Sequence, residues 1–334
     1  HIHPIETGYA NDAIARIPEV GFRVPDRSED AVKAQEFAQR TKDRMMRSFS
    51  GPHFDGISAV AQTLSLIERS NAACRHFLGV GFEYELKPAG QILPNEAEPR
   101  SRGGVDSSLD ITTTPQRWVQ IEQAVTAVFG ADFFKSVVET RKDIHKEIGQ
   151  TTASDELGHS VGILPDTFER LGGIDFASTF IEEWKATVGG FLGALVIPFK
   201  DATGEVTLDD LRDWIISKVA MACRYATVRT RPGGIMYFRK SLMLMKVLQE
   251  QEILVHRPDL SEAFPWTIDL EDPAKIEATL DVLFEQYRKV LSLYGEGGEA
   301  ELREFLTANL QPTLFTEFLC SRVEVPNIEA HTPD

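Results

Sequence analysis

Apolar residues recur at helical spacing along most of the chain, and this pattern restricts the fold more than any other feature. Helix start signals accompany the pattern. Ser28 precedes Glu29 and Asp30, which is typical of a capped first turn, and Thr114-Pro115 places proline at a first helical position. Alternating strand patterns are almost absent, with residues 81–86 the best short candidate.

We therefore predict an all-α protein with a single large helical domain of about ten helices. The domain is expected over residues 28–320, between an extended N-terminal segment (1–27) and a C-terminal tail (321–334). Residues 87–113 form one long loop, and a loop of this length is typical of either a lid or a solvated insertion. Arg100 and Arg102 in this loop are predicted to meet an anionic group of a substrate.

The charge balance narrows the expected partners. The chain has 35 basic and 51 acidic residues and a formal net charge of −16, which disfavours binding to nucleic acid or to an anionic membrane. No apolar run approaches the roughly 20 residues of a membrane span, and the first residues do not resemble a signal peptide. The three cysteines, far apart, fit a reducing compartment, so we predict a cytoplasmic location.

Arg141 and His145 are the most unusual residues of the helical pattern. On a helical projection of residues 131–149 they fall within an apolar stripe, while the acidic and lysine side chains fall on the other side. The stripe is formed by Phe134, Val137, Val138, Ile144 and Ile148. A cation and an imidazole that face inward need a partner, which can be a carboxylate, a metal or a cofactor.

An iron cofactor is the interpretation that uses this pair most fully. His145 would be the proximal ligand of haem b, and Arg141 would anchor a haem propionate or a substrate carboxylate. His159 would be the acid–base group or a second ligand, and Glu156, three residues before it, completes a pair known from helical di-iron proteins. Non-haem iron is the second choice. An Arg141–Glu183 ion pair without a cofactor is the structural alternative.

These residues predict an oxidoreductase of the oxygenase or peroxygenase type, acting on a small organic substrate, with His159 and Arg141 as catalytic residues. The expected partner is therefore a small-molecule substrate. The broad apolar faces of several helices are also compatible with a homodimer.

A magnesium-dependent class I terpene synthase or prenyltransferase is the alternative enzyme. Asp209, Asp210 and Asp213 match the DDxxD motif of these enzymes. Asp209 and Asp210 also lie in the first turn of a predicted helix that Thr207 caps, where acids are favoured by the helix dipole. Asn309, Thr313 and Glu317 match the spacing of the second metal motif, but Pro312 interrupts the helix that would present them. A helical protein that binds an apolar ligand without catalysis is the third alternative.

Overall fold

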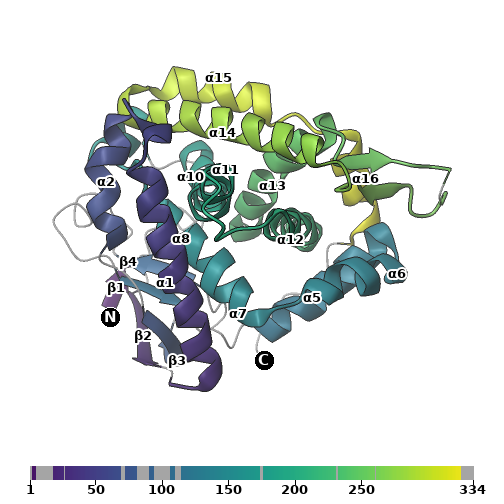
Figure 1. The fold of residues 1–334 in the computed structure, drawn as a ribbon, viewed down its shortest axis with the longest axis horizontal. Helices are drawn as coiled ribbons and strands as arrows, with labels where there is room; N and C mark the ends of the chain where they lie inside the picture. Colours follow the sequence, from purple (N-terminus) through teal and green to yellow (C-terminus); the bar gives the residue numbers. More distant parts are fainter. Residues whose placement is uncertain are drawn as a thin grey trace, which may run out of the picture.

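The computed structural model describes residues 2–4, 18–25, 27–68, 72–80, 90–93, 106–109, 114–173, 176–230, 232–259 and 261–324 (Figure 1). These residues form one mostly helical domain, as the all-α prediction requires, with a few short strands in addition. The last described helix is α16 (Leu314–Arg322). The predicted domain boundaries remain predictions.

Eight of the described α-helices exceed ten residues and build the body of the domain. They are α1 (Glu29–Phe49), α2 (Ser58–Glu68), α5 (Thr114–Phe129), α10 (Phe176–Phe191), α12 (Leu208–Ala226), α13 (Pro232–Glu250), α14 (Pro273–Glu296) and α15 (Glu299–Asn309). The shorter α-helices, besides α16, are α6 (Ala131–Phe133), α7 (Ile144–Lys146), α8 (Ala153–Ser160), α9 (Thr167–Arg170) and α11 (Ile197–Lys200). The 3-10 helices are η1 (Pro52–Phe54) and η4 (Glu139–Arg141), and the π-helices are η3 (Phe134–Val138), η5 (Glu147–Thr152) and η6 (Leu192–Val196).

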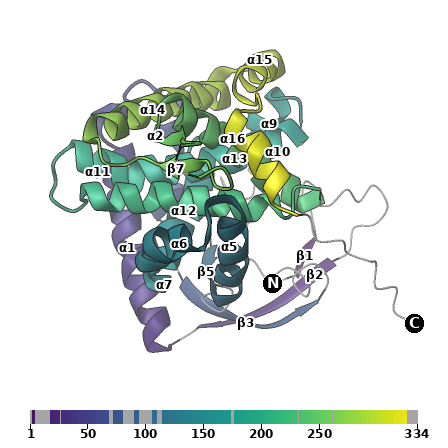
Figure 2. The same cartoon turned by 90° about the vertical axis from the view of Figure 1, so that its right-hand side faces the viewer.

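Five short strands form a sheet in the order β1-β2-β3-β5-β4 at one edge of the helical body (Figures 1 and 2). They are β1 (Ile2–Pro4), β2 (Pro18–Pro25), β3 (Ala72–Val80), β4 (Gly90–Leu93) and β5 (Asp106–Leu109). All neighbours are antiparallel except β3 and β5. A separate hairpin joins β6 (Leu254–His256) to β7 (Trp266–Ile268). The predicted loop 87–113 therefore contains β4 and β5, and its other residues, like the candidate strand 81–86, lie outside the described residues.

The predicted capping residues begin their helices as expected. Ser28 accepts a hydrogen bond from the Ala31 amide at 3.3 Å and so caps α1. Thr207 and Asp210 form a reciprocal capping box at the start of α12. α5 starts at Thr114, and it ends at Phe129 before Gly130, whose φ of 89° an L side chain rarely adopts.

α10 runs through the centre of the molecule, with α12 and α13 beside it and α14, α1 and α5 around them (Figure 1). Every residue from 179 to 198 is buried, and this stretch includes Trp184 and Phe191. Burial of so much apolar surface stabilises the domain. It also means that the polar side chains of α10 must find partners inside the protein.

The segment between α5 and α8 differs from the regular helix that the sequence predicts. A π-helix (η3) is followed by a 3-10 turn (η4), and Lys142, with ψ of 107°, breaks the helix before α7. A second π-helix, η5, then leads into α8. Side chains on either side of Lys142 therefore do not share one helical face.

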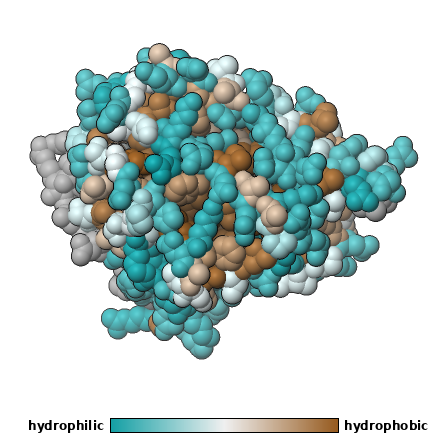
Figure 3. Space-filling view, turned by 45° about the horizontal axis from the view of Figure 1, so that its top comes forward, coloured by the Kyte–Doolittle hydropathy of each residue, from teal (hydrophilic) through white to brown (hydrophobic). Residues whose placement is uncertain are grey.

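Hydrophilic residues cover most of the surface shown in Figure 3, with apolar patches between them. Among the described residues, no helix is both long enough and apolar enough to cross a membrane.

Candidate metal centre

Two glycines allow α8 and α10 to approach each other closely. A Cβ atom on Gly158 would overlap the backbone of Ala186, and one on Gly190 would overlap the backbone of Ser154. Glycine has no Cβ, so the two backbones can pack at these points. The packing of Gly158 against α10 explains why a glycine is present inside a short helix.

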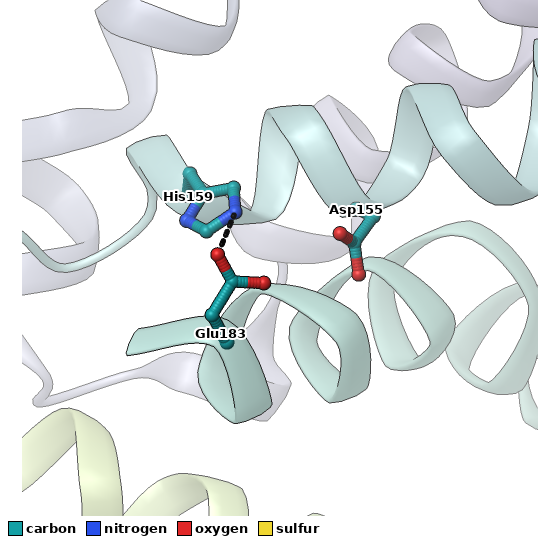
Figure 4. Close-up of side chains that lie close together, drawn as sticks. All are labelled: Asp155, His159 and Glu183. Carbon is teal, nitrogen blue, oxygen red and sulfur yellow. Dashed lines mark ion pairs between the residues drawn. The ribbon is translucent and has the colours of Figure 1, made fainter. Parts of the chain in front are cut away.

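This close approach brings three metal-ligating side chains together (Figure 4). Asp155 and His159 are four residues apart and share one face of α8, while Glu183 comes from α10. One donor atom from each of the three lies within 4.8 Å of the other two, and the His159 Nε2 atom is 4.0 Å from Glu183 Oε1. We call Asp155, His159 and Glu183 the ligand cluster. It is the only group of this kind among the residues that the structure describes.

Glu182 and Lys185 hold the imidazole of His159 in position. Glu182 Oε1 lies 3.0 Å from His159 Nδ1, and the Lys185 ammonium lies 3.0 Å from the same carboxylate oxygen. The Lys185 side chain has no exposed surface and also donates to the His159 carbonyl oxygen at 3.2 Å. A histidine that donates from Nδ1 to a carboxylate leaves the lone pair of Nε2 for a metal.

Lys240 enters the same space from α13. Its ammonium is 3.1 Å from Glu183 Oε2, 3.9 Å from Asp155 Oδ2 and 3.0 Å from the Thr187 hydroxyl. Thr187 in turn donates a hydrogen bond to Asp155. Burial alone would raise the pKa of Asp155, but the Lys240 charge and other nearby cations outweigh burial and lower it.

Glu156 follows Asp155 and lies within electrostatic range of the ligand cluster. Burial raises the pKa of Glu156 to about 7, although the nearby His159 acts in the opposite direction. Burial would also raise the pKa of Glu182, but Lys185 and the hydrogen bond with His159 lower it to about 2. Glu156 and Glu182 both interact with His159, and their pKa values lie on opposite sides of the ordinary value, a pattern typical of catalytic sites.

A divalent cation fits this donor set. Imidazole and carboxylate groups are ordinary ligands of zinc, and the carboxylate on Nδ1 supplies the orienting partner that metal-bound histidines usually have. The ligand atoms around zinc lie about 3.3 Å apart, because each is about 2.1 Å from the ion. The 4.0 Å between His159 Nε2 and Glu183 Oε1 means that the ligand cluster must contract slightly around such an ion.

The inward position predicted for Arg141 and His145 is wrong. His145 Nε2 is 2.8 Å from Asp30 Oδ1 and its side chain is 28% exposed, while Arg141 Nε is 3.2 Å from Asp213 Oδ1. The break at Lys142 places the two residues on separate short helices, so the helical projection does not apply across it. Neither residue belongs to the ligand cluster.

The predicted Arg141–Glu183 ion pair is also wrong, since each residue has another partner. Arg141 is paired with Asp213, and Glu183 is paired with Lys240. Arg100 and Arg102, the predicted substrate contacts, lie outside the described residues.

The aspartates of the DDxxD motif stabilise α12 and its neighbours. Asp209 pairs with Arg212 at 2.9 Å, and Asp210 caps the helix through Thr207. Asp213 is 2.8 Å from the Lys146 ammonium. The acidic start of a helix, rather than a metal motif, accounts for these residues.

The second metal motif is divided between two helices. Asn309 ends α15 and its Oδ1 accepts a hydrogen bond from Gln286, whereas Thr313 caps α16, which carries Glu317. The break around Pro312 therefore prevents the three residues from sharing one helical face.

Of the predicted site residues, His159 belongs to the ligand cluster and Glu156 lies beside it. The sequence prediction does not include Asp155, and it places Glu183 only in an ion pair with Arg141. A signal for Asp155 was present: Asp155-Glu156-Leu157-Gly158-His159 has the spacing of the HExxH motif with aspartate at the first histidine. For Glu183, only its inward position was readable from the sequence.

No protein-family model matches the sequence, and no curated protein matches it significantly. Solved structures do resemble the fold. Dipeptidyl-peptidase III from Corallococcus sp. strain EGB has a TM-score of 0.67 at 14% identity, covering 98% of this chain and 58% of that one. Dipeptidyl-peptidase III from Caldithrix abyssi has a TM-score of 0.62 at 14% identity, covering 92% and 56%. The chain thus spans less than two thirds of the length of either structure.

The fold corrects the functional prediction. The structures that share it are peptidases, neither oxygenases nor terpene synthases, so the predicted oxidoreductase function is wrong. The haem b and non-haem iron cofactors are wrong for the same reason, and His145 lies outside the ligand cluster. The terpene synthase and the non-catalytic binding protein also lack support. The predicted homodimer and the expected absence of nucleic-acid and membrane partners remain predictions.

Proposed function

We propose that this chain is a metal-dependent hydrolase that cleaves peptide bonds in short peptides. The observation that carries the proposal is the meeting of Asp155, His159 and Glu183 on two closely packed helices. The fold of two solved dipeptidyl-peptidase III structures supports the peptidase class. A peptide of a few residues is then the small-molecule substrate that the sequence predicts.

The arrangement of α8 matches the chemistry of helical metallopeptidases. In the HExxH motif, two ligands lie one helical turn apart and the glutamate after the first ligand is the general base. Asp155, Glu156 and His159 have the same spacing, with a carboxylate replacing one imidazole. When bound, the metal ion would activate a water molecule and polarise the peptide carbonyl group.

The chain's own residues would divide the remaining work. The carboxylate of Glu156 would accept a proton from the attacking water molecule and deliver it to the departing amine. A pKa of about 7 suits both proton transfers near neutral pH. Glu182 would keep the proton of His159 on Nδ1, and Lys185 would hold Glu182 in place. Glu182 and Lys185 act through His159, so we assign both of them a positioning role.

The cytoplasmic location is part of the proposal. Cys223 and Cys320 are free thiols in the structure, which agrees with a reducing compartment.

The test measures metal binding and peptide hydrolysis on the same preparations. The purified chain is stripped with EDTA, titrated with zinc or manganese by calorimetry, and assayed with a dipeptidyl arylamide. We expect hydrolysis that chelation abolishes, and a loss of about 10²- to 10⁴-fold in kcat/KM for Glu156→Gln with metal binding retained. Glu169→Gln, at an exposed glutamate, is the matched control. Failure to bind metal, or full activity of Glu156→Gln, would contradict the proposal.

A further inference from the structure

A lysine ammonium lies against the ligand cluster. Lys240 reaches it from α13, the helix that packs against α10, and only 9% of its side chain is exposed. Its nitrogen contacts carboxylates from both ligand-bearing helices, since it is 3.1 Å from Glu183 on α10 and 3.9 Å from Asp155 on α8. Two of the three residues that would bind a metal are therefore already paired with a positive charge.

The contacts around Lys240 form a connected set. The Thr187 hydroxyl accepts from the ammonium at 3.0 Å and donates to Asp155, so it links the lysine to the first ligand. The ammonium also lies over the Tyr237 ring, 4.9 Å from the ring centroid. This aromatic face offers the ammonium a second favourable contact at the edge of the ligand cluster.

The size of the ammonium accounts for the open spacing of the ligand cluster. Hydrogen bonds from an ammonium to a carboxylate are about 2.8 Å or longer, whereas carboxylate oxygens bind zinc at about 2.1 Å. Carboxylates arranged around an ammonium are therefore farther apart than carboxylates around a metal. The ligand atoms of the cluster lie within 4.8 Å of one another, and the 4.0 Å from His159 Nε2 to Glu183 Oε1 is longer than the spacing around zinc.

We propose that Lys240 is a built-in competitor for the metal, whose ammonium neutralises Asp155 and Glu183 and must move aside before a divalent cation can bind both. The proposal rests on the proposed function, because it concerns the same ligand cluster. Two positive charges near one pair of carboxylates repel each other, so metal binding requires the loss of the Lys240–Glu183 contact. Lys240 thereby weakens metal affinity and stabilises the metal-free chain.

Calorimetric titration with zinc alone tests the inference. The EDTA-stripped wild-type chain is compared with Lys240→Met and with Lys240→Arg, which retains the charge. We expect Lys240→Met to bind zinc at least tenfold more tightly than the wild type, and Lys240→Arg no more tightly. Lys246→Met is the matched control on the same helix, because Lys246 contacts Glu250 and the Ala308 carbonyl rather than the ligand cluster.

A second measurement, of the melting temperature, tests the inference even if Lys240→Met is less stable than the wild type. Removing Lys240 leaves Asp155 and Glu183 without its charge, so the metal-free Lys240→Met chain should melt at a lower temperature than the wild type. Zinc should then raise its Tm by more than it raises that of the wild type. An equal or smaller rise would overturn the inference.

The outcomes also separate this inference from the proposed function. Equal zinc affinity of the wild type and Lys240→Met would overturn the role of Lys240 and leave the metal site intact. Zinc binding by neither chain would overturn both. Binding by Lys240→Met alone would support the competition and show that Lys240 keeps the natural site free of zinc.

Discussion

Replacing Glu156 by glutamine should stabilise the metal-free chain at alkaline pH. Burial raises the pKa of Glu156 from 4.5 to about 7, so the folded chain holds this proton more firmly than the unfolded chain does. Stability therefore falls as the pH rises through this interval, by about 1.4 kcal/mol for each pH unit. Above about pH 8 the free energy of unfolding of the wild type has fallen by roughly 3 kcal/mol. A glutamine at this position stays neutral, so the variant does not lose this stability.

Urea unfolding in the presence of EDTA, followed by circular dichroism at pH 4.5 and pH 8, measures this difference. Glu156→Gln and the wild type should have similar free energies of unfolding at pH 4.5, and the variant should be more stable by up to about 3 kcal/mol at pH 8. The exposed control Glu169→Gln should differ from the wild type by less than about 0.5 kcal/mol at both values. A variant that gains nothing at pH 8, or gains equally at both values, would refute the reasoning.

Three further predictions concern the contact between α8 and α10, the carboxylate of Glu182 and the free cysteines. Gly158→Ala should lower stability by about 1–3 kcal/mol and weaken zinc binding, because the added methyl group meets the Ala186 backbone; unchanged calorimetric traces would contradict this packing. Glu182, with its pKa lowered to about 2, stabilises the fold above about pH 4.5 and ceases to do so as the pH falls toward 2. Glu182→Gln should therefore be less stable by about 3 kcal/mol at pH 7, with a difference that shrinks below pH 4.5 in urea unfolding. Cys223, fully buried, should resist alkylation while Cys320 reacts, and mass spectrometry that finds equal labelling would disagree.

Local signals predicted the helical architecture well. The Ser28 and Thr207 caps and the Thr114-Pro115 start each lie where a described helix begins, because capping depends on neighbouring residues alone. The helical spacing of apolar residues from Ser58 continues to His76 and predicts one helix over this whole stretch, which is wrong. α2 ends at Glu68, and residues 72–80 form β3, whose pairing with β2 depends on residues far away in the sequence.

The site was predicted only in part, for two physical reasons. The projection that placed Arg141 and His145 inward assumes an uninterrupted α-helix, and the break at Lys142 is set by packing that local spacing does not reveal. His159 is a predicted site residue that also lies in the ligand cluster, but its partners Glu182 and Glu183 come from a helix more than twenty residues away. Their approach depends on the contact between Gly158 and Ala186, which no pattern within α8 predicts.

A π-helix, η5, lies directly before α8, the helix that carries Asp155 and His159. A π turn accommodates one residue more than an α-helix of the same length. Loss of a single residue between Glu147 and Thr152 would turn this stretch into regular α-helix without altering the spacing from Asp155 to His159. The same loss would displace Ile148, Gly149 and Gln150, which are buried, and Gly149 lies directly against the Ala34 backbone of α1. The packing of η5 on α1 therefore fixes the length of the chain at this point, just before the helix that carries Asp155 and His159.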